Sequence, residues 1–375
     1  MKVVFLFMSQ SSASPGATRR VIPKNDCHFF YHEQFAGEGY FALMQRLVDM
    51  KVITDLKIFY ESNKGPGLAH WVKGKNVYCE VIPEIRFVHD YIDSDTILFV
   101  RGGFKHWYDF LLKYKDQNWL MLYAANTGRE RWLFWDVILN DLSEVELVDI
   151  HGRYWHYFLK PIDEETFYKE QAKNKHYDFC FGASHIHDKK GQWLAVNALK
   201  EYNIRYGALN AVMPGVPRRS ANTTKMLNEV LPNVSHVFAP GHVNRNMLRG
   251  IFNQCKYFMH LGSHGQNDRG PLEAMACGVP VILASPGYHA PFLVRNSFLM
   301  ADREDPVAVA MRMRDFILGY NSNLHNLTRK LFVQESSFED VVVPRFSKLL
   351  GMMSSTKPTL KAKKEIKEMF DGRSQ

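Results

Sequence analysis

The fold is decided by residues 240–286, which read PGHVNRNMLRGIFNQCKYFMHLGSHGQNDRGPLEAMACGVPVILASP. YFMHL (257–261) and VPVIL (279–283) are apolar runs of strand length, bounded by Gly and Pro. Between them lies a loop of turn residues, and Pro271 stands where the first helical position is expected. A strand, a glycine-containing loop and a helix N-terminus in this order favour the binding of an anionic group.

Glu273 is expected in the first turn of that helix, PLEAMAC. A carboxylate at that place stabilises a helix through the dipole by about 0.3–1 kcal/mol, which is one explanation of its presence. Beside an anion site, the same carboxylate is also well placed to accept hydrogen bonds from ribose hydroxyls. The residues alone leave both interpretations open.

GPLEAMACGVPVI (270–282), which follows FMHLGSHG (258–265), resembles the donor-site signature of retaining GT-B glycosyltransferases, especially glycosyltransferase family four. The resemblance implies an α/β chain of the GT-B fold, in which two Rossmann-like domains face each other across a cleft. It also implies that Glu273 holds the ribose of a donor nucleotide. Its neighbours in that donor site are Gly270, Pro271 and Leu272.

The family carries an earlier Glu eight residues before this one, where the present chain has Gly265. The identity of the transferred sugar therefore stays open. A second departure follows the strand YDFCF (177–181), where the family has a Gly-Arg pair and then a Lys-Gly pair that neutralise the donor diphosphate. Lys190 and the glycine after it keep the second pair, but the Arg is replaced by Ala183 or Ser184.

The resemblance extends to the residues after VFAPG (237–241), whose counterparts meet the nucleotide base. It implies donor contacts, besides those above, from Gly182, Ser184, Lys190, His242 and Val243. Lys190 is also the residue expected to stabilise the departing diphosphate.

The first 150 residues match the family only loosely, but they read as the β–loop–α–β opening of a Rossmann-like domain. VVFLFM (3–8) predicts a strand, GEGYFALMQRLVDM (37–50) a helix and DLKIFY (55–60) a second strand. On the helix, one face is expected to carry Phe41, Leu43, Met44, Leu47 and Val48. The intervening loop would line the acceptor side of the cleft with Gly16, Arg19 and Arg20, although solvated loop charges are the alternative for the arginines.

Two further strands, TILFV (96–100) and WLMLYAA (119–125), end in polar residues. Since the carboxyl ends of parallel strands face the ligand crevice, Arg101, His106 and Asn126 are candidates for the catalytic set together with Lys190. The histidine that the family usually places near the end of the second strand has no counterpart here. His106 is its candidate substitute, against the alternative of a histidine on a helix surface.

Asp93 and Asp95 form a pair that elsewhere can hold a metal-bound nucleotide. Here the pair precedes the strand TILFV instead of following it, so it reads as the turn at the start of that strand. We therefore predict no metal site.

The chain has 375 residues, 46% of them hydrophobic and 23% charged, which suits two globular domains. We expect an acceptor-side domain in 1–170 and a nucleotide-sugar-binding domain in 171–345. Residues 346–375 are expected to form a C-terminal helix that packs back on the first domain, or a basic tail.

A net charge of +8 favours an anionic partner, with simple solubility as the alternative. The five cysteines are scattered without a CxxC pair, which predicts neither zinc nor disulfides. No apolar stretch approaches 18 residues, so no transmembrane segment is expected. We expect a cytoplasmic protein, with peripheral attachment to a membrane as a variant, and the host-cell cytoplasm if the protein is viral.

The resemblance implies a retaining, metal-independent glycosyltransferase with no permanently bound cofactor and a UDP- or GDP-sugar as co-substrate. The acceptor stays unassigned: a surface polysaccharide or glycolipid is slightly favoured over modified bases of viral DNA. A protein that binds a sugar nucleotide without turnover is the alternative from a different class.

Overall fold

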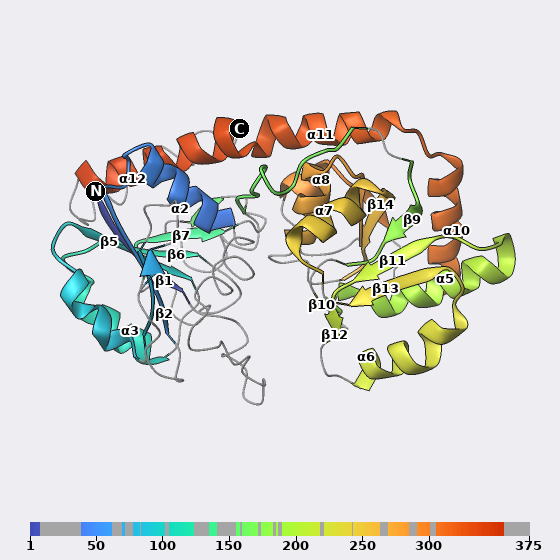
Figure 1. Ribbon diagram of the computed structural model, residues 1–375, viewed down its shortest axis with the longest axis horizontal. Coiled ribbons are helices and arrows are strands. Elements are labelled where there is room, and N and C mark those ends of the chain that lie inside the picture. The colour runs from blue at the N-terminus through green and yellow to red at the C-terminus, as the bar shows by residue number, and fades with distance from the viewer. Residues whose placement is uncertain are drawn as a thin grey trace. The chain divides into compact units, whose positions relative to one another are not determined.

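The computed structural model describes residues 1–7, 39–61, 70–71, 78–82, 84–101, 105–123, 135–140, 155–157, 160–171, 174–182, 185–186, 190–217, 221–241, 243–262, 269–284, 291–300 and 305–355. The chain forms two compact units (Figure 1). The first comprises Met1–Pro161 with Phe338–Gln375, and the second comprises Ile162–Ser337. The sequence places the domain boundaries after residues 170 and 345, and the two units divide after residues 161 and 337.

The first unit is built on an eight-stranded sheet in the order β3-β4-β2-β1-β5-β6-β7-β8. Its strands are β1 (Lys2–Phe7), β2 (Asp55–Glu61), β3 (His70–Trp71), β4 (Tyr78–Ile82), β5 (Thr96–Arg101), β6 (Leu120–Tyr123), β7 (Val137–Asn140) and β8 (Trp155–Tyr157). All neighbours pair in parallel except β3 with β4. The strand order reverses at β1 and β5, which is the expected location of a ligand crevice in such a sheet.

After Lys2, strand β1 is apolar because it is covered on both faces. Val3 and Phe5 belong to one core cluster, while Val4 and Leu6 belong to another. The helices and 3-10 turns of this unit are α2 (Gly39–Asp49), η3 (Ile85–Tyr91), α3 (Lys105–Leu111), η4 (Leu112–Tyr114) and α12 (Val343–Ser355), which follows the π-helical turn η9 (Phe338–Val342).

Helices α2 and α12 cover the same face of the sheet (Figure 1). On α2, the predicted apolar face is confirmed for Leu43, Met44 and Leu47, which are buried, and for Val48, which is partly buried. The side chain of Phe41 lies outside the described residues. Phe346 of α12 packs with its ring 5.9 Å from that of Phe99 in β5.

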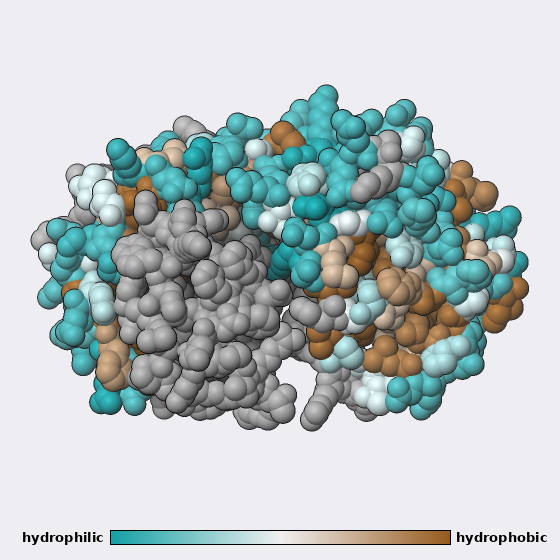
Figure 2. All heavy atoms as spheres, in the orientation of Figure 1, coloured by the Kyte–Doolittle hydropathy of each residue, from teal (hydrophilic) through white to brown (hydrophobic). Residues whose placement is uncertain are grey.

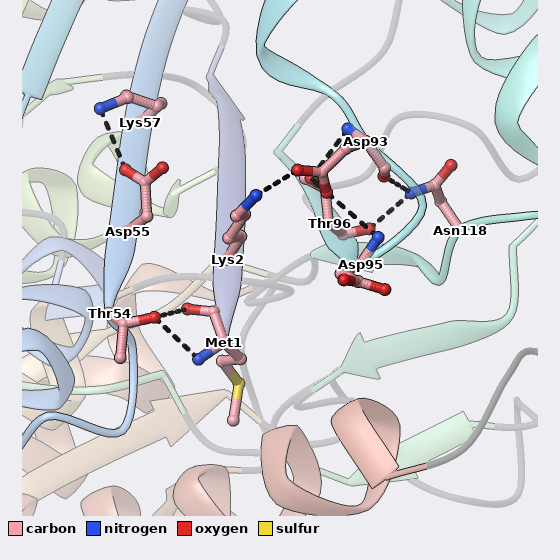
Figure 3. A network of polar contacts seen from close by, with 9 residues as sticks. All are labelled: Met1, Lys2, Thr54, Asp55, Lys57, Asp93, Asp95, Thr96 and Asn118. Atoms are coloured by element: carbon pink, nitrogen blue, oxygen red, sulfur yellow. Dashed lines mark hydrogen bonds and ion pairs between the residues drawn. The ribbon is translucent and has the colours of Figure 1, made fainter.

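Asp93 and Asp95 lie in the turn before β5, as the sequence predicts (Figure 3). The Asp93 carboxylate accepts hydrogen bonds from the Asp95 backbone N–H at 3.1 Å, from Thr96 Oγ1 at 2.8 Å and from the Lys2 ammonium. Asn118 Nδ2 donates to the carbonyls of Asp93 and Thr96. These bonds, that from Lys2 first, lower the pKa of Asp93. The pair therefore ties the amino ends of β1 and β5 together, at the edge of the sheet opposite to the expected crevice.

The second unit is built on a six-stranded parallel sheet in the order β13-β11-β9-β14-β15-β16. The strands are β9 (Tyr177–Cys180), β11 (Ala211–Pro214), β13 (Val237–Gly241), β14 (Cys255–His260), β15 (Val281–Ala284) and β16 (Phe298–Met300), with a small parallel pair β10 (His185–Ile186) and β12 (Val216–Pro217) beside them. The order reverses between β9 and β14.

Helices cover both faces of this sheet (Figure 1). They are α5 (Gln192–Tyr206), α6 (Ala221–Lys225) with the turns η7 (Met226–Val230) and η8 (Leu231–Asn233), α7 (Arg245–Asn253), α8 (Arg269–Ala276), α9 (Pro291–Arg295), α10 (Pro306–Leu318) and α11 (Asn323–Ser336). On one face, α5 and α10 pack together over Phe179 and Ile282. On the other, α7 packs on β14 through Phe252, whose ring meets that of Phe258 edge to face at 5.5 Å.

The start of α8 corrects one sequence expectation. The helix begins at Arg269, so Pro271 is its third residue, and its first turn contains no acidic residue. Pro is tolerated there because the first N–H groups of a helix have no intrahelical partner. Glu273 therefore lies beyond the first turn, and the helix dipole does not explain its presence.

The part of the chain described here contains no helix long and apolar enough to cross a membrane. Within the same residues, no group of three His, Cys, Asp or Glu side chains could hold a metal ion. Figure 2 shows that the visible face of the second unit combines hydrophilic atoms with a broad hydrophobic area. The exposed large apolar side chains of this unit include Ile204, Phe238, Met247, Met311 and Leu318.

Candidate functional site

The candidate site lies at the carboxyl edge of the second sheet, where the strand order reverses. Strands β9 and β14 are neighbours there, with β11 and β13 on one side and β15 and β16 on the other. In open parallel sheets, ligands bind outside the carboxyl ends of the strands at such a point. The predicted donor residues after both strands are therefore on the edge that this topology selects.

The N-terminus of α5 is held against the end of β14 by a close backbone approach. Gly191 caps α5 with φ 75°, and a Cβ at this position would come within 2.3 Å of the Leu261 carbonyl carbon. Gly182, at φ 135°, follows β9, and its Cβ would meet Gln192 Nε2 at 3.0 Å. Glycine at 191 thus lets the positive end of a 15-residue helix lie beside the ends of the two central strands.

Lys190 immediately precedes Gly191 and is half-buried. Its position adds a cation to the N–H groups at the start of α5. Because backbone N–H groups at a helix N-terminus bind anions, this corner of the site suits a phosphate or diphosphate.

Glu273 is buried in the middle of α8, with 2% of its surface exposed. Arg245 Nη1 donates a hydrogen bond to Glu273 Oε1 at 2.5 Å. A buried carboxylate requires such a partner, because burying an unpaired charge is costly. Arg245 is the first residue of α7, and Asn244 caps that helix by accepting from the Met247 backbone N–H at 2.9 Å.

One face of α7 holds the segment that enters the second unit, residues 162–171. The Arg245 guanidinium lies 5.7 Å from the centre of the Phe167 ring. Four residues later, Arg249 Nε donates to Glu170 Oε1 at 3.2 Å. Four residues after Arg249, the Asn253 side chain accepts a hydrogen bond from the Glu170 backbone N–H at 2.9 Å and donates one to the Tyr168 carbonyl. This spacing places the three side chains on one side of the helix.

The thiol one turn after Glu273 is not a nucleophile. Cys277 is 1% exposed. Burial, followed by the charge of Glu273, raises its pKa far above the ordinary range. Burial and the raised pKa both disfavour the thiolate that nucleophilic attack requires.

The structure places several of the predicted donor residues at this edge of the second unit: Gly182, Lys190, Val243, Gly270, Pro271, Leu272 and Glu273. Val243 is 9% exposed and directly precedes the cap of α7. Ser184 and His242, which the sequence places beside them, lie outside the described residues, as do Ala183 and Gly265.

The predicted residues of the acceptor side belong to the first unit. Arg101 is the last residue of β5 and pairs in register with Phe7 of β1, at the point where the strand order reverses. His106 lies in the first turn of α3. The side chains of Arg101 and His106 lie outside the described part of the chain. Asn126, Gly16, Arg19 and Arg20 lie outside it entirely.

The sequence does not predict the contacts of Arg245 and Phe167. It contains one signal for Arg245: a cation in the first turn of a helix is unfavourable to the helix dipole, so another interaction has to compensate it. The partner, 28 residues further along the chain, could not be found from the spacing.

Residues 163–330 match the model of the family described as glycosyl transferases group 1. This segment lies entirely within the second unit. None of the curated proteins is similar enough in sequence to match the chain.

Solved structures of similar fold cover nearly the whole chain. Sucrose-phosphate synthase from Thermosynechococcus elongatus has a TM-score of 0.69 at 12% identity, with 95% of this chain and 100% of that chain covered. A trehalose-6-phosphate protein from E. coli, bound with UDP-2-fluoro glucose, has a TM-score of 0.65 at 11% identity, covering 93% and 99%. Anabaena HepE, in complex with UDP and glucose, has a TM-score of 0.63 at 13% identity, covering 94% and 99%.

The two parallel-sheet units and these similarities confirm the predicted GT-B fold. The similarity of residues 163–330 to the glycosyl transferases group 1 family, on a chain with the GT-B fold, supports a nucleotide-sugar-dependent glycosyltransferase. This match agrees with the resemblance to group 1 glycosyltransferases that residues 270–282 carry.

Proposed function

We propose that this glycosyltransferase transfers a sugar with retention of configuration from a UDP-sugar to an acceptor at a membrane surface. The observation that carries the proposed donor site is the burial of Glu273 in α8. This helix follows β14, and the strand order of the second sheet reverses between β9 and β14. The helix dipole does not explain this carboxylate, so recognition of ribose hydroxyls is the interpretation that we favour.

In this proposal the donor is bound along the carboxyl edge of the second sheet. Glu273 accepts hydrogen bonds from the ribose, Lys190 and the N-terminus of α5 hold the diphosphate, and Val243 meets the base. The remaining donor contacts come from Gly182, Ser184, His242, Gly270, Pro271 and Leu272.

The chemistry follows from where charge develops. As the bond between the sugar and the phosphate oxygen breaks, the diphosphate gains negative charge, which Lys190 and the N–H groups of α5 stabilise. The acceptor oxygen forms its bond to the anomeric carbon on the face that the diphosphate leaves. Its proton passes to the departing phosphate oxygen, so no separate base is required. Arg101, His106 and Asn126 are proposed to act from the acceptor side.

A UDP-sugar is preferred to a GDP-sugar because two of the structural neighbours were solved with UDP or a UDP-sugar. Both structures share the fold of this chain at low sequence identity, so UDP is the first nucleotide to test. The cationic and dipolar groups of the site perform the charge neutralisation that a metal ion performs elsewhere.

A glycolipid or a membrane-attached polysaccharide is the acceptor that we favour. The chain carries a net charge of +8, and its second unit exposes large apolar side chains over a broad area (Figure 2). Basic charge alone suits DNA equally well, but exposed apolar side chains suit a lipid interface better. Gly16, Arg19 and Arg20 are proposed to line the acceptor side, and the protein to act in the cytoplasm at the membrane surface.

A nucleotide screen with one matched variant tests the donor site. Melting temperatures are measured with UDP, GDP, ADP, dTDP and their sugars, for the parent chain, Glu273→Gln and Glu335→Gln. Glu335 pairs with Arg295 on the surface of the same unit and serves as the control. A ligand at 100 times its dissociation constant stabilises the folded state by about 2.7 kcal/mol. We expect UDP to raise the melting temperature of the parent and of the control but not of Glu273→Gln; equal shifts in all three would overturn the donor assignment.

Transfer is then measured with radiolabelled UDP-sugar and three acceptors: lipid vesicles with glycolipid, soluble polysaccharide and duplex DNA. Labelled glycolipid is the expected product, and NMR of its anomeric proton shows whether the configuration is retained. Labelled DNA would identify the alternative acceptor instead. Binding of UDP-sugar with neither transfer nor hydrolysis would favour a non-catalytic binding protein.

A further inference from the structure

Arg245 contacts two buried partners. One is the Glu273 carboxylate, and the other is the face of Phe167, which is 2% exposed. The Arg245 side chain itself is 21% exposed. An Arg in the first turn of a helix opposes the helix dipole, so its presence at the start of α7 indicates that these contacts compensate the cost.

The contact with Glu273 engages one carboxylate oxygen. Arg245 Nη1 binds Oε1, and within the described part of the chain Oε2 accepts no hydrogen bond. A carboxylate held at one oxygen has its second oxygen fixed in direction but still able to accept. That arrangement suits a group that must receive a ribose hydroxyl in a defined orientation.

Phe167 is itself held firmly. Its ring lies 6.3 Å from that of Phe252 in α7. Three residues before Phe167, Glu164 Oε1 accepts a hydrogen bond from Arg329 Nη2 at 2.6 Å. Three residues after it, Glu170 pairs with Arg249. Arg329 also donates to the Ala276 carbonyl at 2.8 Å, so the same segment is tied to the end of α8, the helix that carries Glu273.

We infer that Arg245 is a positioning residue for the donor site: braced by Phe167, it orients the Glu273 carboxylate toward the ribose. The inference rests on the proposed role of Glu273 in donor binding. It adds that the segment 162–171, which connects the two units, helps to set the affinity for the nucleotide through Phe167.

The test is a double-mutant cycle on the full chain, read as the dissociation constant of UDP by isothermal titration calorimetry. We expect Arg245→Met to weaken UDP binding about tenfold, and Arg245→Lys, which keeps the charge, to recover part of that loss. In a Glu273→Gln background, Arg245→Met should change the affinity less than about twofold, because its effect passes through the carboxylate.

A matched control is offered by the ion pair between Lys256 and Asp178. Lys256 Nζ lies 2.7 Å from Asp178 Oδ1, and both side chains are largely buried in the same sheet. These residues lie near the amino ends of β14 and β9, at the opposite edge from the candidate site. Lys256→Met should lower the melting temperature and leave the UDP affinity unchanged within about twofold.

Two groups of outcomes would overturn the inference, and they are distinguishable. If Arg245→Met affects UDP affinity no more than Lys256→Met does, or if its effect adds fully to that of Glu273→Gln, Arg245 does not act through the carboxylate, and the proposed donor site is unaffected. If Glu273→Gln leaves UDP affinity unchanged, or if UDP does not bind the parent chain, the proposed donor site is wrong and the inference is wrong with it. Should Arg245→Met fail to fold, Phe167→Leu replaces it. We expect this variant to bind UDP about threefold more weakly, and an unchanged affinity would show that the contact of Phe167 with Arg245 does not matter for the donor site.

Discussion

Arg329 and Glu164 are 165 residues apart in the chain, and their side chains meet at 2.6 Å. The pair is mostly buried, with 24% and 19% of the two side chains exposed. Arg329 uses a second nitrogen to bind the carbonyl at the end of α8. The residues that enter the second unit are therefore fixed by a helix that is close to the end of that unit.

Arg329→Met should lower the free energy of unfolding by about 1–3 kcal/mol, because a hydrogen-bonded and largely buried charge pair is broken. Urea denaturation of the parent and the variant measures the change. Arg312→Met is the control, since Arg312 and Asp315 form an exposed pair in the same unit and such pairs contribute about 0–1 kcal/mol. Equal effects of both substitutions would show that burial of the Arg329 pair does not matter.

Gly191→Ala should destabilise the protein by roughly 2–5 kcal/mol, because it combines a left-handed backbone with a Cβ that has no space beside Leu261. Gly207→Ala shares the positive φ but meets nothing within 4 Å, so about 1–2 kcal/mol is expected. Gly250→Ala, within α7 and with open space, should stabilise by about 0.5–1 kcal/mol. Denaturation midpoints rank the three variants, and any other order would contradict the steric account of the α5 N-terminus.

His325 should make stability depend on pH below neutrality. Burial, followed by the charges of Lys175 and Lys169, lowers its pKa to about 3. Its ordinary pKa in the unfolded chain is near 6.5, so between these values the unfolded state binds the extra proton. The contribution of the neutral imidazole is complete above pH 6.5 and is lost progressively as the pH falls toward 3.

The measurement is urea unfolding at pH 7.5, 6.5 and 5.5 for the parent and for His325→Gln. Carboxylates contribute to the slope in both proteins, so the difference between them isolates the histidine. We expect the parent to lose about 1 kcal/mol more than the variant between pH 6.5 and 5.5. Parallel curves would show that His325 titrates normally in the folded protein.

Cys180, Cys255 and Cys277 should resist alkylation in the folded protein, because all three are buried and free. Burial raises the pKa of Cys255 and of Cys277, which suppresses the reactive thiolate further. Peptide mapping after iodoacetamide treatment at pH 8, with and without urea, measures each cysteine separately. Rapid modification of any of the three without urea would contradict its burial.

The alternation of apolar and turn segments was sufficient to predict the central strands of both sheets. Strands covered on both faces read as continuous apolar runs, so the sequence predicts strands at VVFLFM, YFMHL and VPVIL. The donor residues from Gly270 to Glu273 were found from a motif with local spacing. The sequence predicts the start of α8 two residues late, at Pro271, because Pro favours the first helical position, although the first turn tolerates Pro at several positions.

The contacts that complete the site could not be predicted in the same way. Arg245 meets Glu273 across 28 residues of the chain, and Phe167, which precedes Arg245 by a still longer stretch, meets it as well. No periodicity connects such positions, because they come together only when α7, α8 and the entering segment pack on one sheet. Opposite charges are frequent enough that pairing them from sequence would give many false partners.

The position of α12 has a consequence for biosynthesis. Phe346, Leu349 and Leu350 complete the core that β1 and α2 begin, so the first unit needs residues made after the whole of the second. On the ribosome, the amino-terminal sheet and α2 emerge early, while the part of the core that α12 completes is still exposed. Residues 162–337 follow as one continuous segment of the chain. The half of the enzyme that is translated first therefore completes its core last, and its exposed apolar residues are a binding site for a chaperone until α12 is made.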